Sequence, residues 1–197
     1  MKSLSLATPH LLVMVGIPGS GKSFFAEKFS DTFNAPFVSY HTIASLAESN
    51  AQEIGDYMIT ELMKSHQSLL VEGRSDTRRE RMELAKLARV HGYEPLYIWV
   101  QVDAETAQNR AARPGKDKSN RIMEASDHEQ LVKRFAPLTA GEKSVVISGK
   151  HTYASQAKVV LRKLSEAHVA ETKTVHPPSR PNRPDTGLSG RHNISIG

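Results

Sequence analysis

The sequence predicts an α/β fold in which helices cover both faces of a parallel β-sheet. Short apolar runs alternate along the chain with longer stretches of helical periodicity, and such alternation joins parallel strands through right-handed crossovers. The first apolar run is unbroken, which is typical of a strand buried on both faces. With 197 residues, 39% of them apolar and 24% charged, the composition suits a single globular domain.

The first elements are expected close to the N-terminus. The unbroken apolar run predicts a strand at Leu11–Val15, and a helix is expected over Lys22–Phe33, whose phenylalanines gather near one side. A short second strand is expected at Pro36–Ser39. One long helix is then expected over Thr42–His66, because apolar residues recur there at spacings of three and four.

The middle of the chain repeats this order. A third strand is expected at Leu69–Glu72, and a capping box at Thr77-x-x-Glu80 predicts the start of the next helix. Gly92 is expected to end that helix before a fourth strand at Leu96–Val102.

The remaining elements close the fold. Asp103 is placed to cap a helix that ends near Ala112, and a polar break follows at Pro114–Asn120. The last helix, strand and helix are expected at Asp127–Arg134, Ser144–Ser148 and Tyr153–His168.

We expect one domain over residues 1–169, with a small lid at about residues 110–127. Residues 170–197 contain four prolines, few large apolar side chains and a surplus of basic residues. Such a segment cannot bury enough apolar surface to fold, so the sequence predicts a disordered tail.

Charge and cysteine content narrow the classes of partner and compartment. The formal charge of +5 suits polyanionic partners such as nucleotides or nucleic acid, but it is also common on a solvated surface. The chain has no cysteine, which excludes disulfides and thiolate metal sites and fits a reducing compartment. No run approaches the ~20 apolar residues that span a bilayer. We therefore expect a cytoplasmic protein with no membrane partner.

The turn after the first strand carries the strongest functional signal. Residues 16–23 read GIPGSGKS and match the phosphate-binding motif G-x-x-x-x-G-K-[ST] at every fixed position. Glycines let successive backbone N–H groups point at phosphate oxygens, and the following helix adds the positive end of its dipole. ATP or GTP is the expected ligand, and the absence of a guanine-reading motif favours adenine. The predicted nucleotide contacts are Gly16, Pro18, Gly19, Ser20, Gly21, Lys22, Ser23, Phe24 and Arg110.

A magnesium site is predicted at the same turn. The Ser23 hydroxyl can ligate Mg²⁺, which prefers hard oxygen ligands and phosphates. Glu72 ends the third strand, which is expected beside the first, and a carboxylate there can hold a magnesium-bound water. The alternative for Glu72 is an exposed carboxylate at a strand end.

Basic residues around the polar break are candidates for catalysis together with Lys22. Guanidinium groups on a lid can clamp phosphoryl oxygens as charge develops, and we assign this role to Arg110 and Arg113, with Arg121 nearby. The alternative is a solvated basic end of a helix.

The acceptor is expected at the carboxyl ends of the second and third strands, where ligands of open α/β sheets collect. We predict that Arg74 and Asp76 bind it. Arg74 belongs to a basic cluster with Arg78, Arg79 and Arg81. The alternative is that this cluster is ordinary surface charge of a helix. His41 follows the second strand and can take a proton from an acceptor hydroxyl, and Asp76 is another candidate base. Each can equally be an exposed or structural residue.

From the P-loop onward the chain resembles the polynucleotide-kinase-like P-loop kinases, the AAA_33 domain family, over about residues 11–164. The residues that carry the resemblance are GIPGSGKS at 16–23, Ser39–Ala44 after the second strand, Glu72–Arg81 at the third, Asn109–Arg113 before the lid and Phe135–Pro137 after it. The resemblance implies a three-layer P-loop NTPase fold with five parallel strands in the order 2-3-1-4-5. It also implies transfer of the γ-phosphate of Mg-ATP.

The departures from the family fall on the acceptor side. Where the family has an Asp that acts as the acceptor's base and a nearby Arg, this chain has His41 and Ala44, and the third-strand Asp is replaced by Glu72. A kinase with an unidentified acceptor, either a nucleotide, a polynucleotide end or a small molecule, therefore competes with an ATP-binding regulatory protein or slow ATPase. A nucleic-acid-associated factor with a basic tail is a third hypothesis, although aromatic and basic residues are not interleaved.

Overall fold

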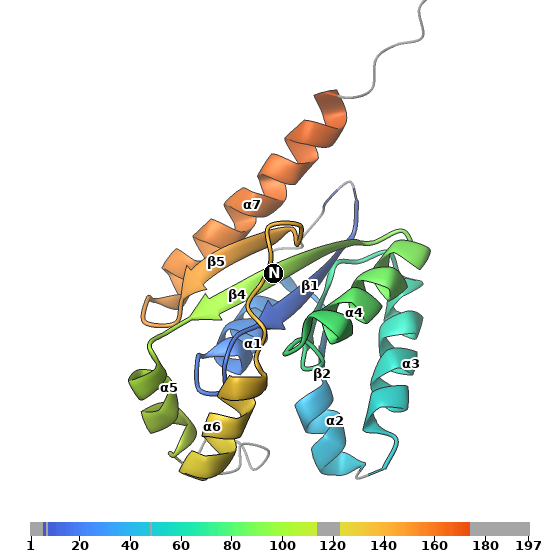
Figure 1. Ribbon diagram of the computed structural model, residues 1–197. Coiled ribbons are helices and arrows are strands. Elements are labelled where there is room, and N and C mark those ends of the chain that lie inside the picture. Colours follow the sequence, from blue (N-terminus) through green and yellow to red (C-terminus); the bar gives the residue numbers. More distant parts are fainter. Residues whose placement is uncertain (1–5, 7, 48, 114–122, 174–197) are drawn as a thin grey trace, which may run out of the picture.

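A computed structural model describes residues 6, 8–47, 49–113 and 123–173 (Figure 1). Within these residues the chain forms a five-stranded parallel sheet in the order β2-β3-β1-β4-β5, which confirms the predicted fold class and strand order. The strands are β1 His10–Val15, β2 Phe37–Ser39, β3 Leu69–Glu72, β4 Glu94–Gln101 and β5 Ser144–Ser148.

Helices cover both faces of the sheet (Figure 1). The described helices are α1 Lys22–Phe33, α2 Tyr40–Leu46, α3 Ala51–Met63, α4 Arg78–Val90, α5 Ala104–Ala111, α6 Ala125–Arg134 and α7 Tyr153–Lys173. Side chains of α1 and α7 pack with alternate residues of the strands, such as Leu12 and Met14, on one face. Side chains of α3 and α4 pack with the intervening residues, such as Leu11 and Val13, on the other. The sandwiched position of β1 explains why its sequence is apolar without alternation.

The prediction of a single helix over Thr42–His66 is wrong. The chain forms α2 and α3, separated at Ala47, which is extended (φ −131°), and at Asn50, which is left-handed (φ 72°). Ser39 starts α2 by accepting a hydrogen bond from the backbone N–H of Thr42. Apolar spacing alone does not reveal this break, because it continues through Leu46, which is 82% exposed.

Local capping signals place α4 correctly. The Thr77 side chain accepts a hydrogen bond from the N–H of Glu80, and the Glu80 side chain accepts one from the N–H of Thr77. The helix ends at Val90, just before Gly92, whose φ is 77°. The predicted start of this helix is therefore confirmed in its details.

The C-terminal helix runs past its predicted end at His168 to Lys173 and so into the segment expected to be a tail. The rest of that tail, residues 174–197, and residues 114–122 of the expected lid lie outside the described residues. None of the helices in the described part of the chain is both long and apolar enough to cross a bilayer.

Candidate active site

The turn between β1 and α1 has a shape that requires glycine. Gly16 and Gly19 adopt φ angles of 145° and 78°. A Cβ at Gly16 would lie 2.5 Å from the carbonyl oxygen of Val100, and a Cβ at Gly19 would lie 2.0 Å from that of Ala107. Because β4 and α5 approach the loop this closely, a side chain at either position would displace backbone.

Lys22 begins α1, and its ammonium group folds back onto the loop. Nζ donates hydrogen bonds to the carbonyl oxygens of Gly16 at 2.8 Å and Ile17 at 3.0 Å. Burial lowers the pKa of Lys22, while the nearby carboxylates of Glu72 and Asp76 act in the opposite direction. A cation held in the concave side of a backbone loop is suited to a polyphosphate.

Ser20 is an independent sign that the loop fits an anionic ligand. Its side chain is fully buried, and its hydroxyl has no hydrogen-bond partner among the described residues. Buried hydroxyl groups in folded proteins normally have such a partner. A phosphate oxygen bound in the loop would supply the missing acceptor.

Ser23 and Glu72, the two residues predicted to hold magnesium, are in direct contact. The Ser23 hydroxyl donates a hydrogen bond to Glu72 Oε1 at 2.7 Å. Parallel pairing of β1 with β3 sets Glu72 opposite Met14, beside the start of the loop. Glu72 is only 3% exposed, so its interpretation as an exposed strand-end residue is wrong.

The donor atoms at this pair fit Mg²⁺, because both are hard oxygens. Among the described residues no group of three or more His, Cys, Asp or Glu side chains could hold a metal by itself. An ion here would therefore complete its coordination with water and phosphate oxygens, as Mg²⁺ commonly does.

Arg110, one of the arginines predicted near the lid, is connected to the loop through the turn after β5. Its Nη1 donates to the carbonyl oxygen of Gly149 at 3.0 Å, in the turn after β5. That turn touches the P-loop, since a Cβ at Gly149 would lie 2.2 Å from the carbonyl oxygen of Ser20. Arg113 is exposed just beyond α5, and Arg121 lies outside the described residues.

On the acceptor side, four side chains form a compact group that we call the Arg74 cluster: Arg74, Tyr40, Asp56 and Glu83. Arg74 donates from Nη1 to Asp56 at 2.5 Å and from Nη2 to Glu83 at 2.7 Å. Its guanidinium lies over the Tyr40 ring, 5.6 Å from the centroid. The Tyr40 hydroxyl donates to the same Asp56 carboxylate, and burial together with this bond raises the pKa of Tyr40.

The two candidate bases differ in position. The Asp76 carboxylate acts to raise the pKa of Lys22, against the larger effect of burial, which lowers it; the Asp76 backbone carbonyl accepts a hydrogen bond from the N–H of Ala136 at 2.8 Å. His41 lies in the first turn of α2 with its side chain exposed. Asp76 thus acts electrostatically on the P-loop lysine, whereas none of the described contacts links His41 to the loop.

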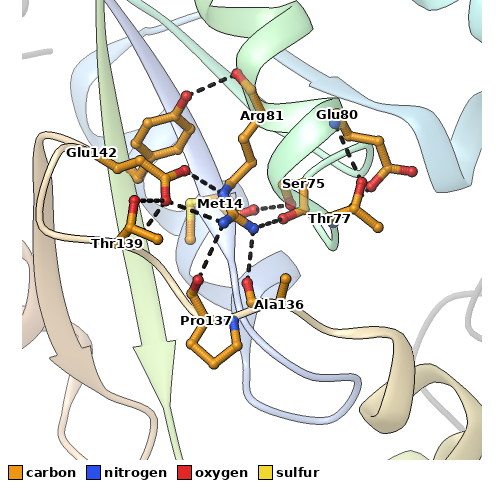
Figure 2. Close-up of polar contacts among 10 residues, drawn as sticks. Met14, Ser75, Thr77, Glu80, Arg81, Ala136, Pro137, Thr139 and Glu142 are labelled. Carbon is orange, nitrogen blue, oxygen red and sulfur yellow. Dashed lines mark hydrogen bonds and ion pairs between the residues drawn. The ribbon is translucent and has the colours of Figure 1, made fainter.

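Arg81, whose polar contacts Figure 2 shows, is fully buried and so differs from the surface cluster in which the sequence places it. Its guanidinium donates to Glu142 at 2.6 Å and to the carbonyl oxygens of Ser75 at 3.0 Å and Ala136 at 2.9 Å. It also bonds Pro137. Arg81 therefore ties α4 to the segment that leads into β5 and offers no charge to an acceptor.

His128 is a contact to the P-loop that the sequence analysis missed. It lies on α6, is 4% exposed, and its Nε2 is 3.2 Å from the carbonyl oxygen of Pro18. The two residues are 110 positions apart, and no local pattern marks this histidine.

A separate groove of about 890 Å³ runs along α4, and its lining includes Met82, Arg89, Tyr97 and Lys143. No P-loop residue lines it. The lining of the groove includes none of Lys22, Ser23 and Glu72. We identify the P-loop turn as the candidate active site, because these three residues meet there.

Comparison with known proteins places the chain in a family. The AAA_33 family of AAA domains matches residues 11–138, well over half of the chain. Among curated proteins, no sequence is similar enough to match.

Solved structures share the fold at low sequence identity. A gluconokinase from Sinorhizobium meliloti has a TM-score of 0.62 and 17% identity, covering 86% of this chain and 99% of its own. A sugar kinase from Janibacter sp. has a TM-score of 0.59 and 20% identity, covering 82% and 97%. Kti12 from Chaetomium thermophilum, solved with ADP-AlF3, has a TM-score of 0.60 and 17% identity, covering 80% and 98%. With the family's strand order and a formed P-loop both present, the chain belongs to the AAA_33 family of P-loop kinase-like proteins.

Proposed function

We propose that this protein is a kinase that transfers the γ-phosphate of ATP, with Mg²⁺, to the hydroxyl or phosphate of an acceptor. The observation that carries the proposal is the combination of the Lys22 ammonium inside a glycine-shaped loop with the Ser23–Glu72 pair beside it. This combination provides a place for a polyphosphate and for a hard divalent cation next to each other.

The residues have distinct roles in the proposed reaction. Backbone N–H groups within residues 19–23 orient the phosphates, and Lys22 holds the β- and γ-phosphates. Ser23 and Glu72 hold Mg²⁺ or its water, and the ion supplies charge neutralisation when it is bound. Arg110, and Arg113 beyond it, stabilise charge that develops on the transferred group.

In the transfer step, an oxygen of the acceptor forms a bond to the γ-phosphorus while the bond from that phosphorus to ADP breaks. For a hydroxyl acceptor the proton passes to a base, for which Asp76 and His41 are the candidates. Asp76 is favoured because its carboxylate acts electrostatically on Lys22. Arg74 and Asp76 are proposed to contact the acceptor.

The comparisons support the donor half of this proposal. Kti12 was solved with ADP-AlF3, and two other structures of the same fold are described as kinases of gluconate and of sugar. An ATP-binding regulatory protein with slow hydrolysis is the second candidate. It is favoured by the exposed His41 at the position where the family resemblance leads us to expect an acidic base.

Lys22→Ala tests the site. We expect it to abolish binding of Mg-ATP, measured by calorimetry, and any release or transfer of γ-labelled phosphate, because the charge that meets the phosphates is gone. Lys28→Ala removes an exposed lysine from the same helix and is the matched control. Wild-type nucleotide affinity in Lys22→Ala would contradict the proposed site. Tight binding with no transfer to a broad panel of nucleosides, oligonucleotides and alcohols would favour the regulatory candidate.

A further inference from the structure

The charges of the Arg74 cluster are balanced once Arg79, which pairs with Glu83, is counted with it. Arg74 pairs with both Asp56 and Glu83, and Glu83 also accepts a hydrogen bond from Arg79 at 3.0 Å. Two guanidinium groups thus face two carboxylates. The Arg74 side chain is only 14% exposed, so its charge is directed at these partners rather than at solvent.

The fold makes special room for this cluster. A Cβ at Gly55 would lie 2.3 Å from a ring carbon of Tyr40, and a Cβ at Gly73 would lie 2.8 Å from the Tyr40 Cβ. Arg74 itself has a left-handed backbone (φ 51°), a conformation that is costly for a residue with a side chain. The surrounding backbone is therefore shaped to hold this cluster, which an ordinary surface ion pair would not require.

The cluster lies directly beyond the carboxyl ends of β2 and β3, of which β3 pairs with the P-loop strand β1. Tyr40 follows Ser39, the last residue of β2, and Arg74 comes two residues after Glu72, whose carboxylate bonds Ser23. The two strands pair with Ser39 opposite Glu72. An acceptor that reaches the γ-phosphate from the side of β2 and β3 thus meets this cluster.

We propose that the acceptor is an uncharged polyhydroxyl compound, recognised by Asp56 and by the Arg74 guanidinium that lies over Tyr40. The acceptor is thus neither a phosphate ester nor a carboxylic acid. This inference rests on the proposed kinase function. A phosphate or carboxylate would need a cation to pair with, but Arg74 has its two carboxylates already. It would also add negative charge near Asp56, Asp76 and the γ-phosphate, which like-charge repulsion opposes.

Hydroxyl groups match the donors and acceptors that remain. A carboxylate has about four lone-pair sites, so Asp56 can accept bonds from a hydroxyl while it keeps Tyr40 and Arg74. A guanidinium has five N–H donors, and Arg74 uses only two in its ion pairs. A compound with neighbouring hydroxyls can therefore bind both groups without breaking the ion pairs.

The test measures binding separately from chemistry. Calorimetry is carried out on the full chain saturated with Mg²⁺ and a non-hydrolysable ATP analogue. The titrants are matched pairs that differ in charge: ribose and ribose 5-phosphate, adenosine and AMP, sorbitol and gluconate. We expect at least one uncharged member to bind about tenfold or more tightly than its anionic counterpart. Asp56→Asn should narrow that ratio, because it removes the repelling charge, whereas a merely structural role would weaken both members equally.

A control variant and the contrary outcomes distinguish the proposed acceptor class from the kinase proposal. Glu61→Gln, which removes an exposed carboxylate on the same helix, should leave the ratio unchanged. Tighter binding of the anionic members, or no binding of any pair, overturns the proposed acceptor class while leaving the kinase proposal standing. Binding of an uncharged member without transfer of γ-labelled phosphate to it overturns the kinase proposal instead. If Asp56→Asn loses affinity for the ATP analogue, Asp56→Ser replaces it in the same titrations, because this variant also removes the charge.

Discussion

The hydrogen atom of the Ser23 hydroxyl already points at the Glu72 carboxylate. Because it donates to Glu72, both lone pairs of the Ser23 oxygen remain available to a cation. In the proposed site, Glu72 would therefore act on magnesium through Ser23 as well as through its own charge. Outer residues that orient metal ligands in this way matter nearly as much as the ligands themselves.

Glu72→Gln is expected to weaken the dependence on magnesium without removing the nucleotide site. The amide can still accept the hydrogen bond from Ser23, but its negative charge is lost, so we expect roughly 10- to 100-fold more Mg²⁺ for half-maximal nucleotide binding or turnover. Titrations with Mg²⁺ at fixed ATP measure this. Asp31→Asn, an exposed change on α1, is the control, and an unchanged Mg²⁺ requirement in Glu72→Gln would remove Glu72 from the site.

Arg81 is a buried cation with fully engaged donors, so its removal leaves Glu142 and three carbonyl groups without their partner. Breaking such a buried pair from one side costs ~3–5 kcal/mol. We expect Arg81→Ala to lower the free energy of unfolding by about that amount in urea denaturation. Arg78→Ala, an exposed neighbour, should change it by less than ~0.5 kcal/mol. Equal effects of the two variants would refute the role given to Arg81.

At the scale of elements, α4 is fixed at its start by the capping box and along its length by Arg81. Thr77→Ala removes the side chain that accepts the N–H of Glu80, and we expect a loss of about 1 kcal/mol. Thr77→Ser should restore most of it, because serine caps equally well. Thermal or urea unfolding measures both, with the exposed Thr42→Ala on α2 as control. No difference between the alanine and serine variants would show that the cap is dispensable.

Elements with strong local signals could be predicted from the sequence. Helix α1 and strands β3 and β5 have the predicted bounds, because apolar runs and the glycine turn mark them locally. The break between α2 and α3 could not be predicted, because it depends on the backbone of Ala47 and Asn50 and not on apolar spacing.

The site divides in the same way. A local motif encodes the P-loop, so its residues could be read directly. Asp56 joins Tyr40 from 16 positions away, Glu142 joins Arg81 from 61, and His128 joins Pro18 from 110. These contacts arise only when separate elements pack, so no sequence pattern reveals them.

For the whole molecule, acid is expected to destabilise the fold through Glu142. Burial acts to raise the pKa of this carboxyl group, but its bonds to Arg81 and Thr139 outweigh burial and lower it from 4.5. A depressed pKa stabilises the fold fully above pH 4.5, and this contribution is lost as the pH falls through the folded-state value.

Glu142→Gln separates this contribution from other titrations. At pH 7 the variant should be less stable than the wild type, and the two should converge as the pH falls below about 4.5. Urea midpoints measured from pH 3 to 7 provide the comparison, and Glu53→Gln on α3 is the exposed control. A constant difference across this range would show that the Glu142 carboxylate does not titrate as described.

The anchoring of α6 at both ends has a mechanical consequence. Just past its last turn, the carbonyl of Ala136 is held by Arg81 and its N–H by the carbonyl of Asp76, while His128 near its first turn rests on Pro18 of the P-loop. The helix is thus held by several hydrogen bonds at Ala136 and by the single His128 contact at the phosphate loop. A displacement of that loop is therefore expected to rotate α6 about Ala136 and not to translate the whole helix.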